Sequence, residues 1–322
     1  MSAAIAIVPH TDAGPRLALV DVRARVEAFV RASRAPNTLR AYRADWGHFT
    51  AWCASAGVAS LPAAAETVAS YLSVMADSGL KAGSVQRRVS AIAAMHRAAG
   101  HESPTGTTLV KLTISGIRRA LGVRQVGKDP VLTINLAGMC SHLRPGLLGI
   151  RDRAILLVGF AGAFRRSELV DLDVEDLQFS ADGVKVVIGH TKTDQEGAGQ
   201  TIGIARGTAL CPAAALTAWL QAASITTGPV FRAIKHGKVQ SPRLRDRTVA
   251  LIVKRYAGAA GLDPKKFAGH SLRAGCVTQA AMSGVPEFAI MRQTRHKSSD
   301  MLRRYIRDAR LFADNASARL GL

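Results

Sequence analysis

The sequence predicts a mainly α-helical protein of two domains, the second of which contains a small antiparallel sheet. Three observations indicate this fold class. Apolar residues recur at steps of three and four along most of the chain, which is the period of a buried helix face. A polar segment broken by Gly and Pro interrupts this pattern near residues 122–130. Only near residues 182–204 does the pattern change to that of a β-hairpin.

Length and composition limit the kind of protein that this chain can be. Its 322 residues suffice for two ordinary domains with real cores, and 48% hydrophobic content excludes disorder as a global description. Lys and Arg number 43 against 23 acidic residues, a net charge of +20. Such an excess repels itself unless a polyanion binds, and nucleic acid is the usual polyanion. A merely soluble basic protein is the alternative that charge alone leaves open.

Cysteine usage and apolar segments bear on location. Cys53, Cys140, Cys211 and Cys276 lie far apart, which argues against a zinc module or a disulfide framework and suits a reducing compartment. No apolar run approaches the roughly 20 residues of a membrane span, and the apolar start lacks the basic region of a signal peptide. We therefore expect a cytoplasmic protein without a membrane partner, associated with the nucleoid if the source is bacterial.

The first 122 residues are expected to form a flexible arm, residues 1–17, followed by a helical domain, residues 18–122. The helix after Pro36 carries aromatic residues at helical spacing, which favours a buried core over a base-stacking platform. Further helices are expected after Pro62, from Ser84 and over residues 106–121. Basic side chains occupy their other faces, where a solvated surface is the plain alternative to DNA binding. The candidates for contacts to DNA phosphates are Arg40, Arg43, Lys81, Arg87 and Arg88.

Residues 123–130 are expected to be a linker, and residues 131–322 a second domain. The stretch 151–163 is almost wholly apolar after a charged start, which predicts a helix buried on most sides. Asp182-Gly183 is a hairpin turn signal, and strands are expected at residues 184–188 and 201–204. Later helices are expected at about residues 212–222, 243–260, 270–282, 286–293 and 300–312.

Several residues of this second domain could carry chemistry, although each has an ordinary interpretation when taken alone. Arg165 could simply pair with Glu168 across one helical turn. Lys192 could be a solvated loop lysine, and many surface pairs share the spacing of His270 and Arg273. A tyrosine among basic residues makes chemical sense if its phenol attacks an anionic group, but a core role is the plain alternative for Tyr305, as it is for the other three tyrosines, Tyr42, Tyr71 and Tyr256.

The order and spacing of these residues distinguish them from chance. From Gly162 the chain reads G-x-x-R-x-S-E-L, and a lysine in an expected β-turn follows. G-H-S-L-R begins at Gly269, R-H-K-S begins at Arg295, and a tyrosine stands nine residues after His296. This set resembles the tyrosine recombinase (phage integrase) family, and its Cre-like members in particular. The stretch Asn37–Tyr42 is similar to the family's core-binding domain, so the resemblance runs from about residue 20 to the end.

The resemblance implies a role for each matched residue. Arg165 and Arg273 would be the catalytic arginines, with Glu168 as the partner of Arg165. His270 would belong to the His-x-x-Arg pair, and His296 falls where the family has His or Trp. The remaining matches are the lysine of the catalytic β-turn, Lys192, for which His190 or Lys185 are the nearest substitutes, and the nucleophile, Tyr305.

The implied chemistry is reasonable on physical grounds. A phosphodiester gathers negative charge in its transition state, and two guanidiniums can stabilise that charge in a forked geometry. A free tyrosine has a pKa of about 10 and needs a base or a positive field, for which His270 is the candidate. Lys192 could protonate the leaving 5′-oxygen. No metal or other cofactor is required, and the acidic run 171–176 indicates a solvated edge, with a two-metal nuclease centre as the weaker alternative.

We therefore expect a two-domain DNA clamp that acts as a site-specific recombinase. By resemblance, strands would be exchanged through a 3′-phosphotyrosine intermediate and a Holliday junction, by a homotetramer on paired double-stranded sites with inverted-repeat cores. The role would be integration, excision or resolution of a mobile element or replicon, and the tail after Phe312 would dock on a neighbouring protomer. The alternatives are a relaxing enzyme like the type IB topoisomerases and a catalytically silent DNA-binding protein of the same fold.

Overall fold

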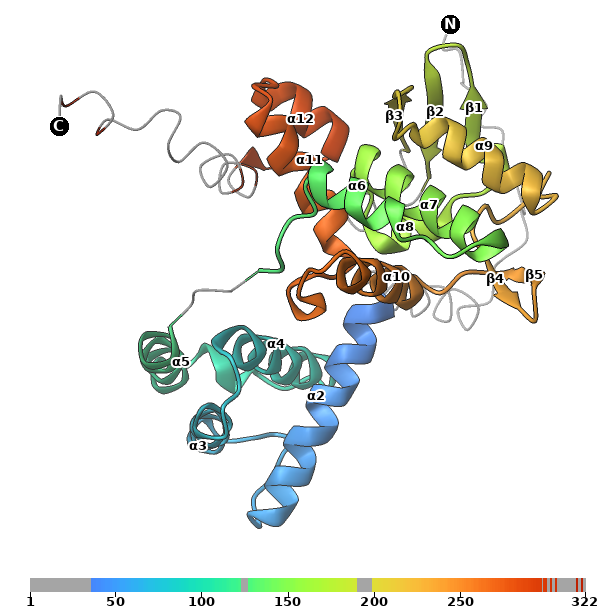
Figure 1. Cartoon of the computed structure of the whole chain (residues 1–322). Coiled ribbons are helices and arrows are strands. Elements are labelled where there is room, and N and C mark those ends of the chain that lie inside the picture. Colours follow the sequence, from blue (N-terminus) through green and yellow to red (C-terminus); the bar gives the residue numbers. More distant parts are fainter. Residues whose placement is uncertain are drawn as a thin grey trace, which may run out of the picture. The chain divides into compact units, whose positions relative to one another are not determined.

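The computed structural model describes residues 36–122, 127–189 and 199–296, together with residues 298, 299, 302, 305, 317 and 320. The chain divides into two compact units, Met1–Gln125 and Val126–Leu322, and each has a hydrophobic core of its own (Figure 1). The expected arm at residues 1–17 and the turn that holds Lys192 lie outside the described residues. The domain boundaries given above stay a prediction.

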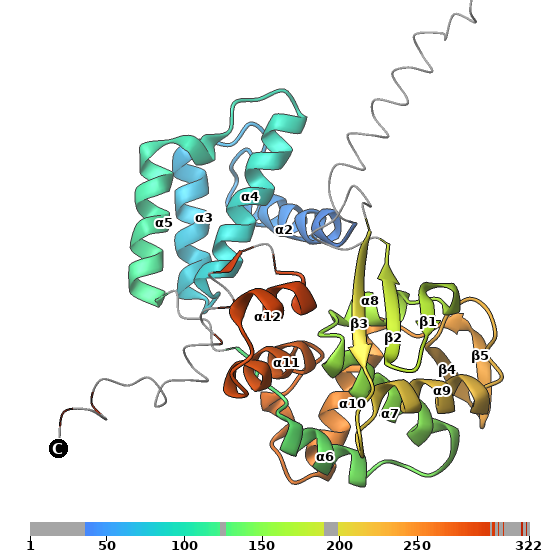
Figure 2. The same cartoon turned by 90° about the horizontal axis from the view of Figure 1, so that it is seen from above.

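The first unit contains four described helices. They are α2 (Pro36–Ser55), α3 (Ala65–Asp77), α4 (Ala82–Ala98) and α5 (Thr108–Leu121), with the short turn η1 (Pro104–Gly106) before α5. Within this unit α3, α4 and α5 run along one another while α2 lies across them (Figure 2). The hydroxyl of Thr107 accepts from the backbone N–H of Val110 and so caps α5.

The aromatic stripe of α2 is core, as expected. Phe49 is fully buried and packs edge-on against buried Tyr71 of α3, with ring centroids 4.9 Å apart. His96 of α4 is also fully buried and satisfied at both ring nitrogens. Its Nε2 accepts from the backbone N–H of Ala63 at 2.9 Å, so its Nδ1–H donates to the carbonyl of Ile92 at 2.9 Å.

The second unit is a helical domain with two small antiparallel sheets. Its helices are α6 (Thr133–Ser141), α7 (Gly146–Ala161), α8 (Arg166–Asp171), α9 (Pro212–Ala222), α10 (Asp246–Ala259), α11 (His270–Met282) and α12 (Glu287–Thr294), with short turns η2 (Val174–Asp176) and η3 (Pro264–Lys266). The strands are β1 (Leu177–Phe179), β2 (Gly183–Ile188), β3 (Gln200–Ala205), β4 (Arg232–Lys235) and β5 (Lys238–Arg243). The mainly α fold class with a small antiparallel sheet is thus confirmed.

The sheets are larger than the sequence indicated. The expected hairpin is present as β2 and β3, paired from Gly183 with Ala205 to Ile188 with Gln200, and β1 adds a third strand along β2. A second, separate hairpin joins β4 and β5. Strand β5 ends at Arg243, the first residue of the helix expected at 243–260, and that helix instead begins at Asp246. Helix α6 also had no counterpart among the expected elements.

The core of the second unit is built around α7. Ala154–Val158 are buried, and α9 packs along this helix while α11 crosses it. The charged pair inside α7 is neutralised within the core, since Arg151 donates twice to Asp152 Oδ1 and the hydroxyl of Tyr256 donates to Asp152 Oδ2 at 3.0 Å. Neither Arg151 nor Asp152 is therefore left without a partner in the core.

The acidic run 171–176 has structural partners, in accord with a surface edge. Asp173 pairs with Arg243 at 2.7 Å, and Glu175 accepts from the backbone N–H of Gly228 at 3.1 Å.

In the described part of the chain, no helix combines the length and the apolar character needed to cross a bilayer.

Candidate active site

Arg165 stands where the turn after α7 enters α8. It has extended backbone angles, φ −67° and ψ 148°, and its N–H donates to Glu168 Oε2 at 2.9 Å. Its guanidinium Nη1 donates to the other oxygen, Oε1, of the same carboxylate. Glu168 is only 4% exposed. Burial alone would raise the pKa of this carboxyl, but the charge of Arg295 and the hydrogen bonds from Arg165 hold the pKa below its usual range.

Arg273 lies on α11, three residues after His270, and is 1% exposed. Its Nη1 donates to the carbonyl of Ala163 at 2.7 Å, in the turn that leads to Arg165. Its Nη2 is buried and has no hydrogen-bond partner within the described residues. Burial and the charges of Arg165 and Arg295 lower the pKa of Arg273 to about 10, so the guanidinium remains charged at neutral pH. The site thus contains a buried positive donor with an unused N–H.

The turn between α7 and α8 joins these arginines. Ala163 is fully buried and has a positive φ of 46°, a conformation that costs a residue with a side chain about 1 kcal/mol or more. Its carbonyl oxygen accepts from Arg273 and, at 3.2 Å, from Nη2 of Arg295. Two long-range arginine contacts therefore hold a strained turn directly before Arg165.

Two histidines share this positive environment. His270 is the first residue of α11, and its pKa is lowered by burial and by the charges of Arg273 and Arg165. The pKa of His296 is lowered to about 4 by burial and by the same two arginines, with smaller contributions from His270 and Arg295. The Nδ1 of His296 is 2.7 Å from the hydroxyl of buried Thr294. Both imidazoles are consequently neutral at pH 7.

Tyr305 belongs to the second unit and is half-buried. It packs against a small cluster formed by Val277 and Ala281 of α11, Ile290 of α12 and Leu302. Tyr71 and Tyr256, in contrast, are 0% and 1% exposed and lie in the two cores. Among these three, Tyr305 is the tyrosine that packs against α11, which carries His270 and Arg273, and against α12, which precedes His296.

The remaining predicted residues fall into two groups. Lys192 and its substitute His190 lie outside the described residues, whereas Lys185 is an exposed residue of β2. In the first unit Arg40, Arg43 and Lys81 are exposed, and Arg87 is half-exposed with a bidentate pair to buried Asp45. Arg88 is 12% exposed and donates to the hydroxyl of Tyr71 and to His48. No DNA contact is described for any of them, so that role stays a prediction.

The sequence reasoning missed Arg295. This residue follows α12, is 6% exposed and pairs with Glu168 Oε2 at 2.9 Å. Its Nη1 donates to the carbonyls of Gly162 and Gln293, both at 3.1 Å, and its guanidinium stacks over the ring of Phe164. The motif R-H-K-S contained it, but only the histidine of that motif was given a role.

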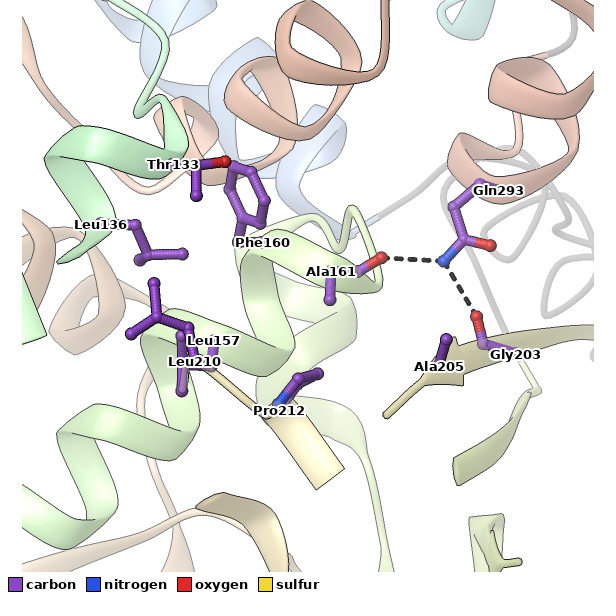
Figure 3. Close-up of a pocket in the computed structure, with 10 residues that line it drawn as sticks. All are labelled: Thr133, Leu136, Leu157, Phe160, Ala161, Gly203, Ala205, Leu210, Pro212 and Gln293. Carbon is purple, nitrogen blue, oxygen red and sulfur yellow. Dashed lines mark hydrogen bonds between the residues drawn. The ribbon is translucent and has the colours of Figure 1, made fainter. Parts of the chain in front are cut away.

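A cavity of about 390 Å³ is lined in part by Ala161 of α7 and Gln293 of α12 (Figure 3). Its lining is mainly apolar and includes Leu136, Leu157, Phe160 and Leu210. At its edge the side-chain amide of Gln293 donates to the carbonyl of Ala161 at 2.8 Å and to that of Gly203 at 3.1 Å. The end of α12 is thereby attached both to the end of α7 and to β3.

Comparison with known proteins assigns the chain to a family. Residues 135–311 match the model of the phage integrase family, and residues 28–103 match the model of the phage integrase N-terminal SAM-like domain. An integrase/recombinase xerD homolog of Selenomonas ruminantium is 46% identical over 297 residues, 89% of this chain and 86% of that protein. The recombinase Cre of Escherichia phage P1 is 23% identical over 81% of this chain and 80% of its own length.

Solved structures share the fold. A lambda integrase (75–356) dimer bound to a COC′ core site matches with a TM-score of 0.61 and 17% identity, over 88% of this chain and 93% of that one. XerH recombinase bound to a palindromic difH substrate, in a post-cleavage complex, matches with a TM-score of 0.60 and 14% identity, over 79% and 72% of the two chains. The chain therefore belongs to the phage integrase family of tyrosine recombinases.

Proposed function

We propose that this tyrosine recombinase cleaves and rejoins strands of double-stranded DNA at specific sites through a covalent 3′-phosphotyrosine intermediate on Tyr305. The observation that carries the proposal is the cluster of partly buried Arg165 and buried Arg273, whose positive charge exceeds what Glu168 can neutralise. A phosphodiester is an anion of the size and geometry that such donors bind. The unused Nη2 of Arg273 is a donor that a non-bridging phosphate oxygen would satisfy.

In the proposed cleavage step, the phenol oxygen of Tyr305 forms a bond to phosphorus while the bond to the 5′-oxygen breaks. The phenol proton passes to His270, which is neutral at pH 7 because its pKa is lowered, and can therefore accept a proton. Lys192 donates a proton to the leaving 5′-oxygen. Rejoining is the reverse reaction, with a 5′-hydroxyl as nucleophile and Tyr305 as leaving group. The phosphodiester energy is retained in the phosphotyrosine, so no external energy source is needed.

The two arginines would bind the non-bridging oxygens as charge accumulates on them. His296 would hydrogen-bond the same phosphate and pack beside the tyrosine. Because the hydroxyl of Thr294 donates to the carbonyl of Ile290 at 2.7 Å, it accepts from the Nδ1–H of His296, and a hydrogen bond from Nε2 to a phosphate oxygen would need the protonated imidazole. Glu168 would act through Arg165, since it binds both the backbone and the guanidinium of that residue.

The wider proposal concerns assembly. The two units would hold duplex DNA as a clamp, with Arg40, Arg43, Lys81, Arg87 and Arg88 serving the phosphate backbone, and four protomers on paired inverted-repeat sites would exchange strands through a Holliday junction in the cytoplasm. Integration, excision and resolution are all compatible with this chemistry. The relatives that support it are the XerH and lambda integrase complexes, which contain DNA.

Replacement of the nucleophile tests the chemistry. Tyr305→Phe should form no denaturation-resistant protein–DNA adduct on a cognate site while DNA affinity is retained, because only the phenol oxygen is lost. Gel mobility after denaturation measures the adduct, and fluorescence anisotropy measures the affinity. If the wild-type protein forms no adduct on its own site, the proposal is wrong and a silent DNA-binding protein is favoured.

A supercoiled plasmid without a cognate site separates recombination from topoisomerase activity. The proposed recombinase leaves such a plasmid unrelaxed, whereas an enzyme like the type IB topoisomerases relaxes it as a monomer. A matched plasmid with two sites is the positive control.

Deletion of residues 314–322 tests the proposed docking tail, most of which lies outside the described residues. Unchanged assembly and recombination after that deletion would remove the tail from the proposal.

A further inference from the structure

Arg295 has a backbone conformation that does not suit an arginine. Its φ of 58° and ψ of 39° lie in the left-handed region, which glycine adopts with less cost. A residue with a side chain persists in that region when its surroundings over-determine it. The surroundings of Arg295 are its contacts to Glu168, to the carbonyls of Gly162 and Ala163, and to the ring of Phe164. All of these partners lie in or next to the turn that presents Arg165.

The charges around Glu168 do not balance. In the described part of this cluster three guanidiniums, those of Arg165, Arg273 and Arg295, accompany the single carboxylate of Glu168. The net charge is therefore +2. Without Arg295, the carboxylate would have Arg165 as its remaining partner, and the net charge would fall to +1. The four terminal N–H groups of Arg295 already donate, to Glu168 and to the carbonyls of Gly162, Ala163 and Gln293, so only its buried Nε–H lacks a partner among the described residues.

We propose that Arg295 is a positioning residue for the phosphate site: it shares the carboxylate of Glu168 so that Arg165 keeps positive charge for the scissile phosphate, and it fixes the Gly162–Ala163 turn that Arg165 and Arg273 both use. This assignment rests on the proposed function, because it presumes that a phosphate is the ligand. Arg295 acts through Glu168 and through two backbone carbonyls, and it does not touch the phosphate.

A purely structural role makes a different prediction. If Arg295 only fills the core and satisfies Glu168, its loss should lower stability without a specific effect on the charge of the site. A double-variant cycle distinguishes the two roles. Removing the charges of both Arg295 and Glu168 restores the net charge of +2 but restores none of the lost contacts. Loss of contacts alone would leave the double variant no better than the single one.

The first readout is the single-turnover rate of adduct formation at saturating protein. Arg295→Gln should react roughly 10- to 100-fold more slowly, as expected when one charge is removed at short range in a medium of intermediate dielectric. Arg295→Gln combined with Glu168→Gln should regain a large part of that loss, and Arg295→Lys should retain more activity than Arg295→Gln. DNA affinity should change little, because the effect belongs to the reacting phosphate and not to the whole interface.

The matched control is Arg243→Gln. Arg243 of β5 resembles Arg295 in its contacts, since it donates to the carbonyls of Val170 and Leu172 and pairs with Asp173. Its loss removes a similar set of hydrogen bonds without touching the carboxylate of Glu168. The control should lose stability comparably while its adduct rate stays near that of the wild type. An equal rate loss in Arg243→Gln would overturn the assignment of a specific role to Arg295.

Arg295→Gly guards against a variant that fails to fold. Glycine suits the left-handed backbone, so the turn after α12 can keep its shape while the guanidinium is lost. This variant should melt closer to the wild type than Arg295→Gln does, and it should still react slowly. Recovery of the wild-type rate in Arg295→Gly would show that the backbone alone is needed, and the proposal would then be wrong.

A second readout needs neither DNA nor catalysis. The imidazole of His296 can be titrated by NMR in the free protein, and its pKa of about 4 is held down in part by nearby positive charge. Arg295→Gln should raise that pKa, and the double variant should bring it down again. A rise of the same size in both variants would indicate simple opening to solvent and would refute the charge role. If the wild type forms no adduct but this order is observed, the recombinase proposal fails while the electrostatic role of Arg295 stands.

Discussion

At the scale of single residues, the site is a buried concentration of positive charge that one carboxylate only partly neutralises. Arg273 is almost fully buried, and its pKa of about 10 reflects the cost of that burial next to two other arginines. Under the proposed function, a phosphate oxygen bound at the Nη2 of Arg273, which is unpartnered within the described residues, would offset part of this cost. The sequence order predicted Arg165 and Arg273. It could not predict Arg295, because its partner Glu168 lies 127 residues away in the chain.

Replacement of Arg273 tests this description. Arg273→Lys keeps a charge but loses the fork, so a lysine cannot bind the Ala163 carbonyl and a phosphate oxygen with the same geometry. We expect adduct formation to slow by roughly 100- to 1,000-fold, the usual effect of losing one donor to a developing anion. The measurement is single-turnover cleavage with DNA affinity as the control. A rate close to that of the wild type would show that this guanidinium does not contact the reacting phosphate.

The histidines predict a pH effect on stability. The pKa of His296 is about 4 in the folded protein against 6.5 ordinarily, so between these values the unfolded chain binds more protons than the folded one. Stability should therefore fall as pH is lowered from 6.5 towards 4, and it should be independent of this residue above pH 7. Thermal melts of wild type and His296→Asn across this range measure the effect. As the pH is lowered, the wild type should lose stability relative to His296→Asn. A difference in melting temperature that does not change with pH would contradict the prediction.

At the scale of elements, close backbone contact fixes α11 to the segment that enters the second unit. The N–H of Val131 donates to the carbonyl of Ser271 at 2.9 Å, and Gly275 lies directly against the backbone of Val131. A Cβ at Gly275 would come within 1.9 Å of the Val131 carbonyl oxygen. Helix α11 carries both His270 and Arg273, so this contact helps to fix the helix on which the two side chains stand.

Gly275→Ala should disturb this contact strongly. Because the obstacle is backbone and not a flexible side chain, we expect a loss of about 3 kcal/mol in the free energy of unfolding, the upper end for overpacking. Denaturant melts measure it. Gly138→Ala on α6 is the matched control, because its Cβ would meet only Ala260 at an ordinary 3.5 Å, and it should stabilise by about 0.5 kcal/mol. Similar effects of the two substitutions would contradict the packing argument.

Elements with a buried face could be predicted from the sequence, whereas elements without one could not. Long helices with one buried face, such as α2 and α10, were visible as periodic apolar residues. The β4–β5 hairpin was missed because neither strand contains a fully buried residue, so no alternation appears in its sequence. Its turn places His236 and Gly237 at φ 49° and 73°, and His-Gly is a weaker turn signal than Asp-Gly.

At the scale of the whole molecule, charge and chain order carry the functional information. The net charge of +20 indicates a polyanionic partner, but it does not say which residues meet that partner. The candidate site combines residues 163–168, 270–273 and 295–296, and no local pattern brings such distant segments together. Resemblance to a family supplied their association. It did not supply the left-handed turns at Ala163 and Arg295, which depend on tertiary contacts.

Salt dependence of DNA binding tests the electrostatic prediction. Each phosphate contact contributes about 0.9 to the slope of log affinity against log salt concentration, so affinity should fall steeply as salt rises. Arg87→Gln should lower that slope by about one, because the side chain is half-exposed. Arg88→Gln should instead lower the melting temperature, since its guanidinium is largely buried against Tyr71 and His48. An unchanged slope in Arg87→Gln would remove Arg87 from the DNA contact.

One further consequence follows from the carbonyl of Ala163, which accepts from two arginines at once. Arg273 and Arg295 have a single peptide unit in common, so rotation of that one plane would break the bond from Arg273 and one of the four hydrogen bonds from Arg295 without moving a helix axis. Such a rotation belongs to loop timescales of nanoseconds to microseconds and not to those of domain movement.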